Sequence, residues 1–119
     1  MATILIIEDV ALNADLLIQL LENEYELVVA GDGEEGLATA SSARPDLILM
    51  DMSLPKIDGY EVTRRIKADP ALRGTAIVGL SAHAMEGDRQ KALDAGCDAY
   101  LTKPLDEDQL FATLDALLP

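Results

Sequence analysis

The chain has 119 residues, a length that fits one compact domain with a hydrophobic core of its own. Its 22 acidic and 9 basic residues give a net charge of −13, which repels both the phosphate backbone of nucleic acids and anionic lipid. Half of the residues are apolar but only three tyrosines and one phenylalanine are aromatic, so the core must be aliphatic. This composition favours a parallel sheet covered by helices, and we expect a single domain over residues 1–119 without a nucleic-acid or membrane partner.

The cysteine content and the start of the chain indicate a cytoplasmic protein. The only cysteine, Cys97, excludes an internal disulfide and fits a reducing compartment. It follows Gly96, a helix-stop residue, so we interpret it as a small buried hydrophobic side chain and not as a reactive thiol. The first apolar run, Ile4 to Ile7, ends at Glu8 and Asp9 and is too short for a signal peptide or a membrane span.

Short aliphatic runs predict five strands that alternate with helical segments. The strands are expected over Ile4–Ile7, Glu26–Ala30, Leu47–Met50, Ala76–Leu80 and Ala99–Thr102. The run that ends at Met50 lies between Pro45 and Pro55 and is apolar throughout, which is typical of a strand buried on both faces. Asp51 follows it directly.

The helical segments differ in the strength of their signals. The first helix is predicted over Ala11–Glu22, with one apolar face formed by Leu12, Leu16, Leu17, Leu20 and Leu21. A turn over Gly31–Gly36 leads into a weaker helix that ends before Pro45, and Asp58 is placed to cap a third helix that ends near Pro70. The fourth helix, Met85 to Ala95, is only modestly amphipathic and ends at Gly96. Asp106 and Gln109 resemble a capping box for the last helix, which carries Leu110, Leu114, Leu117 and Leu118.

This alternation predicts an α/β fold in which a doubly wound, five-stranded parallel sheet carries helices on both faces. In such a fold the carboxyl ends of the strands form one rim, where ligands bind. The residues expected on that rim are Glu8, Asp9, Asp51, Ser81 and Lys103.

Carboxylates held together repel one another unless a cation neutralises them, and a hard ion such as Mg²⁺ prefers oxygen ligands. With that charge in place, Asp51 is a candidate nucleophile that would attack a phosphoryl group and form an aspartyl phosphate. Lys103 offers a point charge suited to phosphate, and the Ser81 hydroxyl offers a hydrogen bond to another phosphoryl oxygen.

These residues, in this order, resemble the receiver domains of two-component response regulators, and the resemblance covers essentially the whole chain. It is carried by Glu8-Asp9 after the first strand, Asp51 with the following MSLPKIDG loop, Ser81-Ala82, and Lys103-Pro104. Each motif closes a different strand. The resemblance implies a flavodoxin-like (βα)5 fold with strand order 2-1-3-4-5.

The same resemblance implies a role for each rim residue. Asp9 and Asp51 would ligate Mg²⁺ directly together with the backbone carbonyl of Ser53, while Glu8 would act mainly through water. Asp51 would accept the phosphoryl group from a histidine kinase or a histidine phosphotransfer protein. Lys103 would pair with the phosphate, and the Lys103-Pro104 peptide would be cis.

The resemblance also implies a switch and a means of output. Ser81 and Tyr100 would be the switch pair, with the tyrosine ring turning inward and altering the face formed by the fourth helix, fifth strand and fifth helix. Ser53 and His83 occupy positions that tune phosphate lifetime in this family. Glu8 departs from the commoner Asp, which could change the water-mediated part of metal binding.

Two other motifs predict different chemistry and are disfavoured. Gly31 to Gly36 matches the dinucleotide pattern GxGxxG, but it follows the second strand and would bring carboxylates against a pyrophosphate. Gly79 to His83 resembles a nucleophile elbow that lacks its second glycine.

We therefore expect a stand-alone receiver whose output is a contact with a downstream protein, and not an enzyme in the ordinary sense, because the chain ends directly after its fifth helix. A small Mg²⁺-dependent phosphohydrolase with an Asp nucleophile, or an interaction domain that is never phosphorylated, remain the alternatives.

Overall fold

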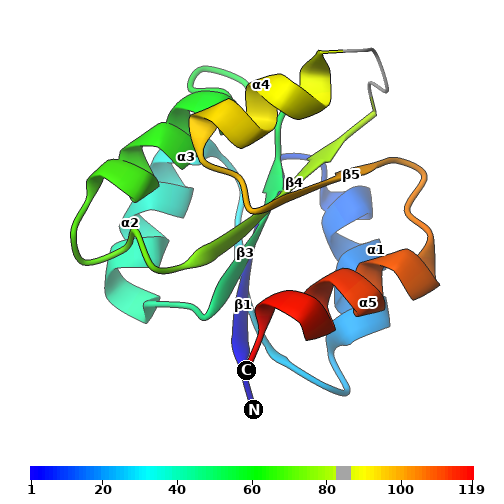
Figure 1. Cartoon of the computed structure of the whole chain (residues 1–119). Helices are drawn as coiled ribbons and strands as arrows, with labels where there is room; N and C mark the ends of the chain where they lie inside the picture. The colour runs from blue at the N-terminus through cyan, green and yellow to red at the C-terminus, as the bar shows by residue number, and fades with distance from the viewer. Residues whose placement is uncertain (83–86) are drawn as a thin grey trace.

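The structure, a computed structural model, describes residues 1–82 and 87–119. Strands and helices alternate along this part of the chain (Figure 1). The elements are β1 (Thr3–Ile7), α1 (Ala11–Leu21), β2 (Glu26–Ala30), α2 (Gly33–Ala43), β3 (Leu47–Asp51), α3 (Gly59–Ala68), β4 (Ala76–Ser81), α4 (Asp88–Ala95), β5 (Ala99–Thr102) and α5 (Glu107–Leu117). All strand pairs are parallel and the order is β2-β1-β3-β4-β5, which confirms the predicted flavodoxin-like fold.

The sheet separates two aliphatic cores, each closed by its own helices. On one face α2, α3 and α4 cover a cluster that includes Ile7, Met50, Val62 and Tyr100. On the other face α1 and α5 cover a cluster built mostly from leucine and isoleucine. Every residue of β3 is buried, as expected of a central strand covered on both sides. No helix in the described part of the chain is long and apolar enough to cross a membrane.

The strand register aligns the carboxyl ends of the four strands that carry the candidate site. Ile7 of β1 pairs with Met50 of β3, so the residues after them, Glu8 and Asp51, leave the sheet at the same level. Asp51 also pairs with Leu80 of β4, and the next residue, Ser81, pairs with Thr102 of β5, so Lys103 follows two residues beyond the level of Asp51. The rim inferred from the sequence is therefore formed by this pairing.

Two helix predictions need correction, and part of a third lies outside the described residues. The predicted apolar face of α1 was wrong for Leu12 and Leu16, which are 68% and 53% exposed, because the helix turns Ala14, Leu17 and Leu21 to the core. The segment at Gly33 is not a turn but the start of α2, because the Asp32 side chain accepts a hydrogen bond from the Glu35 N–H. The described part of the fourth helix begins at Asp88, and the predicted start at Met85 lies outside the described residues.

The cap predictions agree with the structure. Asp58 accepts a hydrogen bond from the Glu61 N–H at 2.9 Å, which caps α3. Asp106 accepts one from the Gln109 N–H at 3.2 Å, which caps α5. Each side chain satisfies one of the N–H groups that a helix start leaves without an intrahelical partner.

Gly59, the first residue of α3, packs directly against the backbone that carries Asp51. A Cβ atom at this position would lie 2.5 Å from the Asp51 carbonyl oxygen and 2.6 Å from the Met52 Cα. Both neighbours are backbone atoms, which cannot move aside as the end of a flexible side chain can. The start of α3 and the end of β3 are therefore fixed against each other.

We expect Gly59→Ala to lower the free energy of unfolding by about 1–3 kcal/mol, because the added methyl group displaces the end of β3. Urea denaturation measures the change. Gly74→Ala is the matched control, because a Cβ at Gly74 meets no heavy atom within 4 Å. Equal stability of the two variants would contradict the close approach at Gly59.

Candidate functional site

The candidate site lies on the rim where β1, β3, β4 and β5 end. Glu8 and Asp9 follow β1, Asp51 is the last residue of β3, Ser81 the last of β4, and Lys103 follows β5. Glu8 and Asp51 are almost fully buried, with exposed fractions of 4% and 6%. Asp9 is exposed. The sequence prediction that these side chains share one rim is consistent with this placement.

Lys103 lies between two of the carboxylates. Its Nζ is 3.1 Å from Glu8 Oε1 and 3.9 Å from Asp51 Oδ1. The Lys103 N–H donates to the Ser81 carbonyl at 2.8 Å, which ties the start of the β5–α5 loop to the end of β4. The Lys103-Pro104 peptide is cis, as the resemblance implied. The cation therefore partly offsets the repulsion between the buried acids.

The three carboxylates form a set that fits a divalent cation. One oxygen from each of Glu8, Asp9 and Asp51 lies within 4.8 Å of the others. These are hard oxygen donors, the kind that Mg²⁺ prefers, and a set of this size leaves coordination positions for water and phosphate. Backbone N–H groups fix the two buried acids, because Val10 donates to Glu8 Oε2 at 3.2 Å and Ser53 donates to Asp51 Oδ1 at 3.0 Å.

Burial and proximity set the protonation of the two buried acids. Burial, and then the neighbouring Glu8 carboxylate, raise the pKa of Asp51 to about 6, against the opposing hydrogen bond from Ser53. Burial also acts to raise the pKa of Glu8, but hydrogen bonds with Asp51, Val10 and Lys103 outweigh it and the pKa is lowered. At acidic pH one proton is therefore held between the two carboxyl groups, mainly on Asp51.

The remaining predicted residues are placed as follows. Ser81 is 2% exposed and Tyr100 is 6% exposed, with its ring packed in the core on the α3 and α4 side of the sheet. Ser53 lies two residues beyond Asp51 with its N–H on the carboxylate. His83, assigned to phosphate-lifetime tuning, lies outside the described residues.

An apolar cleft of about 620 Å³ opens beside Glu8 and Lys103, and the sequence analysis missed it. Side chains of α1 and of the β5–α5 loop line it, among them Leu16, Leu20 and Leu105. Leu16, at which the predicted apolar face of α1 was wrong, is the exposed leucine that lines this cleft. A cleft is formed by segments far apart in the chain, so spacing within α1 alone could not reveal it.

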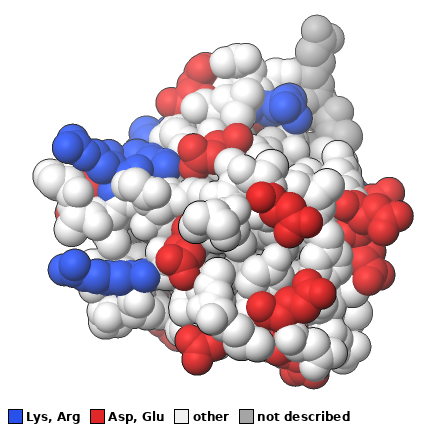
Figure 2. Space-filling model, turned by 60° about the horizontal axis from the view of Figure 1, so that its bottom comes forward, with Lys and Arg blue, Asp and Glu red and all other residues white. Residues whose placement is uncertain are grey.

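Basic residues are confined to the middle of the sequence, whereas acidic residues occur along its whole length. None of the nine Lys and Arg residues precedes Arg44 and none follows Lys103, so all the charged side chains of α1 and α5 are acidic. Figure 2 shows one face of the surface, on which carboxylates are widely spread and most of the visible basic side chains lie on the left. Helix α1, which lines the cleft beside Lys103, and helix α5, which follows the loop that lines it, therefore repel anions and attract cations.

Comparison with known proteins finds one family. The family model of the response regulator receiver domain matches residues 4–115. The polar-differentiation response regulator DivK of Brucella anthropi is 38% identical over 117 residues, which cover 98% of this chain and 95% of that protein.

Solved structures agree. The receiver domain of a sensor histidine kinase from Pseudomonas aeruginosa, solved with a magnesium ion coordinated in its active site cleft, is 36% identical with a TM-score of 0.90, over 98% of this chain and 96% of that one. The chemotaxis protein CheY4 of Vibrio cholerae is 28% identical with a TM-score of 0.92, over 99% of both chains.

We expect Asp51→Asn to stabilise the metal-free chain at neutral pH. Because the pKa of Asp51 is raised from 3.8 to about 6 in the folded chain, the stability contributed by its neutral form is present below about pH 4 and is lost as the pH rises through 6. The substitution should raise the free energy of unfolding by about 1–3 kcal/mol at pH 7 and change it little at pH 4.

Urea denaturation in the presence of EDTA measures this at both pH values. Asp15→Asn, which removes an exposed carboxylate from α1, is the matched control and should change stability little at either pH. An Asp51→Asn chain no more stable than the parent at pH 7 would contradict the raised pKa.

Proposed function

Because this chain belongs to the response regulator receiver family of two-component signal transduction, we propose that residues 1–119 form one receiver domain that is phosphorylated on Asp51. Members of this family are phospho-accepting signalling domains and not classical enzymes. The observation that supports Asp51 is its position at the end of the fully buried β3, with two further carboxylates within 4.8 Å and the Lys103 ammonium 3.9 Å away.

In the proposed reaction a carboxylate oxygen of Asp51 attacks the phosphorus of a phosphohistidine, the P–N bond breaks, and the imidazole leaves. Asp9, Asp51 and the Ser53 carbonyl would hold Mg²⁺, with Glu8 acting through water, and the ion supplies positive charge that offsets the negative charge of the incoming phosphoryl group. Lys103 contributes a second cation beside Asp51, and its contact with Glu8 holds it there.

We propose that Ser81 and Tyr100 form the switch pair. The Ser81 hydroxyl would donate to a phosphoryl oxygen, and Tyr100 would report the change to the face formed by α4, β5 and α5. This face would bind a downstream protein in the cytoplasm. The phosphoryl group can shift the equilibrium between the two conformers of the chain only to the extent that it interacts more favourably with one conformer than with the other. Ser53 and His83 would tune how long the phosphoryl group remains.

Incubation with Mg²⁺ and acetyl phosphate should add one phosphoryl group to the chain, seen by intact-mass spectrometry as an acid-resistant and base-labile adduct. Asp51→Asn should remove the adduct because it replaces the nucleophile by an amide of the same shape. Excess EDTA should also remove it. Asp15→Asn should leave it unchanged.

The same experiment rejects the proposal in two ways. Rapid turnover of many phosphomonoesters, without a lasting adduct, would favour a phosphohydrolase with the same nucleophile. A chain that shows no metal-dependent change at all would favour an interaction domain that is never phosphorylated.

The phosphodonor protein is expected to dock on the apolar cleft beside Lys103. An occupant of this cleft lies next to Glu8 and Lys103 and hence close to Asp51. Leu16, which lines the cleft, is 53% exposed, and the charged side chains of α1 and α5 are all acidic. These features fit a donor surface with apolar side chains flanked by Lys or Arg.

We expect Leu16→Glu to slow phosphoryl transfer from a phosphorylated histidine phosphotransfer protein by about fivefold or more, because it puts a charge into an apolar contact. The rate with acetyl phosphate, which needs no docking surface, should not change. Radiolabel transfer measures both rates. Val29→Glu, which adds a charge at an exposed apolar side chain of β2 away from the cleft, is the control. Equal slowing with both donors would contradict a docking role.

A further inference from the structure

Helix α4 has few stabilising features within its own sequence. It has 8 residues, and its N-cap position is Gly87, which makes no side-chain cap hydrogen bond. Only two alanines of the helix, Ala92 and Ala95, are buried, whereas α5 buries two leucines. Two methyl groups contribute little apolar burial, so the position of α4 depends on contacts that its other side chains make with α3.

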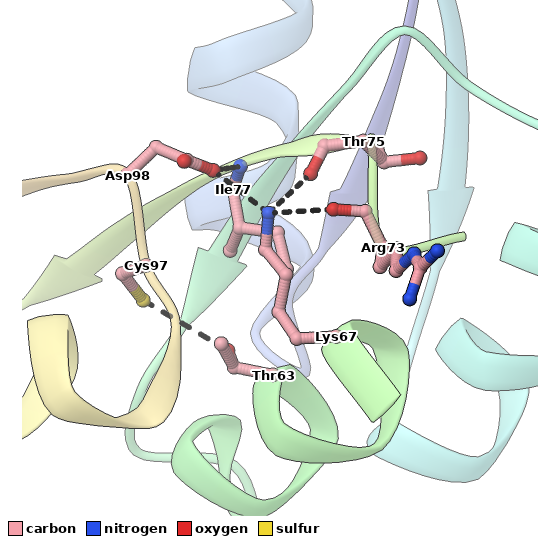
Figure 3. A network of polar contacts seen from close by, with 7 residues as sticks. All are labelled: Thr63, Lys67, Arg73, Thr75, Ile77, Cys97 and Asp98. Carbon is pink, nitrogen blue, oxygen red and sulfur yellow. Dashed lines mark hydrogen bonds and ion pairs between the residues drawn. The ribbon is translucent and has the colours of Figure 1, made fainter. Parts of the chain in front are cut away.

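The C-terminal end of α4 is fixed to α3 by a polar network (Figure 3). Lys67 of α3 donates to the carbonyls of Arg73 and Thr75 at 3.3 and 2.8 Å and to Asp98 at 3.1 Å. Asp98 also accepts from the Ile77 N–H at 2.8 Å. The base of the helix is therefore tied to both α3 and β4.

Two further contacts fix this end of the helix. The Thr63 hydroxyl lies 3.9 Å from the Cys97 sulfur, in a buried position. Gly96, with a φ of 120°, passes so close to Lys67 that a Cβ would lie 2.7 Å from its Cγ. The chain just after α4 therefore has little freedom to move away from α3.

The middle of α4 meets α3 through a different kind of contact. The Lys91 ammonium lies 4.2 Å from the centre of the Tyr60 ring, a cation–π distance. The half-buried Tyr60 packs against the core cluster that contains Tyr100 and Ala92. Burial, and then the nearby Tyr100 and Asp88, raise the pKa of Tyr60, so its ring is uncharged at neutral pH.

We propose that Tyr60 and Lys91 are positioning residues whose contact holds α4 against α3 with Tyr100 buried, while the Lys67–Asp98 network is the fixed base about which α4 can move. The link to phosphorylation rests on the function proposed above. In that proposal the phosphoryl group favours the conformer in which the Tyr100 ring is turned inward. The contact would then help to set how far the unphosphorylated chain already populates that conformer.

The contact itself is tested without metal or phosphate, by hydrogen–deuterium exchange at the amides of residues 91–97. Lys91→Met keeps the aliphatic stem and removes the charge, and Tyr60→Leu keeps an apolar side chain and removes the ring. Each should raise exchange in this segment by about two- to fivefold, the range expected for an exposed cation–π pair. Combining them should add little, because both remove the same interaction.

Three control variants separate this contact from a general effect. Lys91→Arg and Tyr60→Phe keep a cation and an aromatic ring and should exchange like the parent chain. Arg89→Met removes an equal charge from an exposed position of the same helix and should also exchange like the parent. Parental exchange in both Lys91→Met and Tyr60→Leu would overturn the proposal, as would an equal increase in Arg89→Met.

The link to Asp51 is tested by calorimetric titration with beryllofluoride, a phosphoryl mimic, in Mg²⁺. Lys91→Met and Tyr60→Leu should bind the mimic about two- to fivefold more weakly than the parent, and Lys91→Arg as tightly. Unchanged affinity in both would overturn the link. If the parent chain itself fails to bind the mimic, the proposed function fails, while the exchange experiment still decides whether the contact holds α4.

Discussion

Repulsion among acidic side chains is the constraint on which the candidate site depends. The sheet register brings Glu8, Asp9 and Asp51 to one rim, and burial removes much of the water that would screen the first and the last of them. Lys103 offsets part of this repulsion, while burial, and then the neighbouring Glu8 carboxylate, raise the pKa of Asp51 to about 6. The buried carboxylates thus lower the stability of the chain at a place where a bound cation would restore it.

Helix α3 connects this rim with the surface proposed to carry the output. Its first residue, Gly59, packs against the backbone of Asp51, and its second, Tyr60, contacts Lys91 on α4. Further along, Lys67 fixes the segment that follows α4. Helix α3 therefore contacts both the strand end that carries the proposed nucleophile and helix α4, which is a physical reason for the two to respond together.

The sequence predicted the local features of this fold well because each depends on neighbouring residues. Five aliphatic runs indicated the strands, the charged or hydroxyl residues that follow four of them indicated the rim, and Asp58 and Asp106 indicated helix starts. The strand order came only from family resemblance, because nothing local encodes which strands pair.

The predictions failed where a feature depends on residues that are far apart in the chain. Leucine spacing in α1 could not show that Leu12 and Leu16 face solvent, because the helix orientation is set by what Leu17 and Leu21 pack against. The cleft beside Lys103 and the Tyr60–Lys91 contact join residues from distant parts of the chain. No periodicity within one element reports such contacts.

The uneven distribution of Lys and Arg has a consequence for how fast the chain meets other molecules. Helices α1 and α5 present carboxylates without an intervening cation, so their field reaches about one Debye length, roughly 8 Å at physiological ionic strength, and guides positively charged surfaces toward the cleft. The rate at which the chain meets a positively charged partner is then sensitive to salt, unlike the chemistry at the buried rim. For the phosphodonor protein proposed above, ionic strength would therefore change the rate of encounter before any phosphoryl group is transferred.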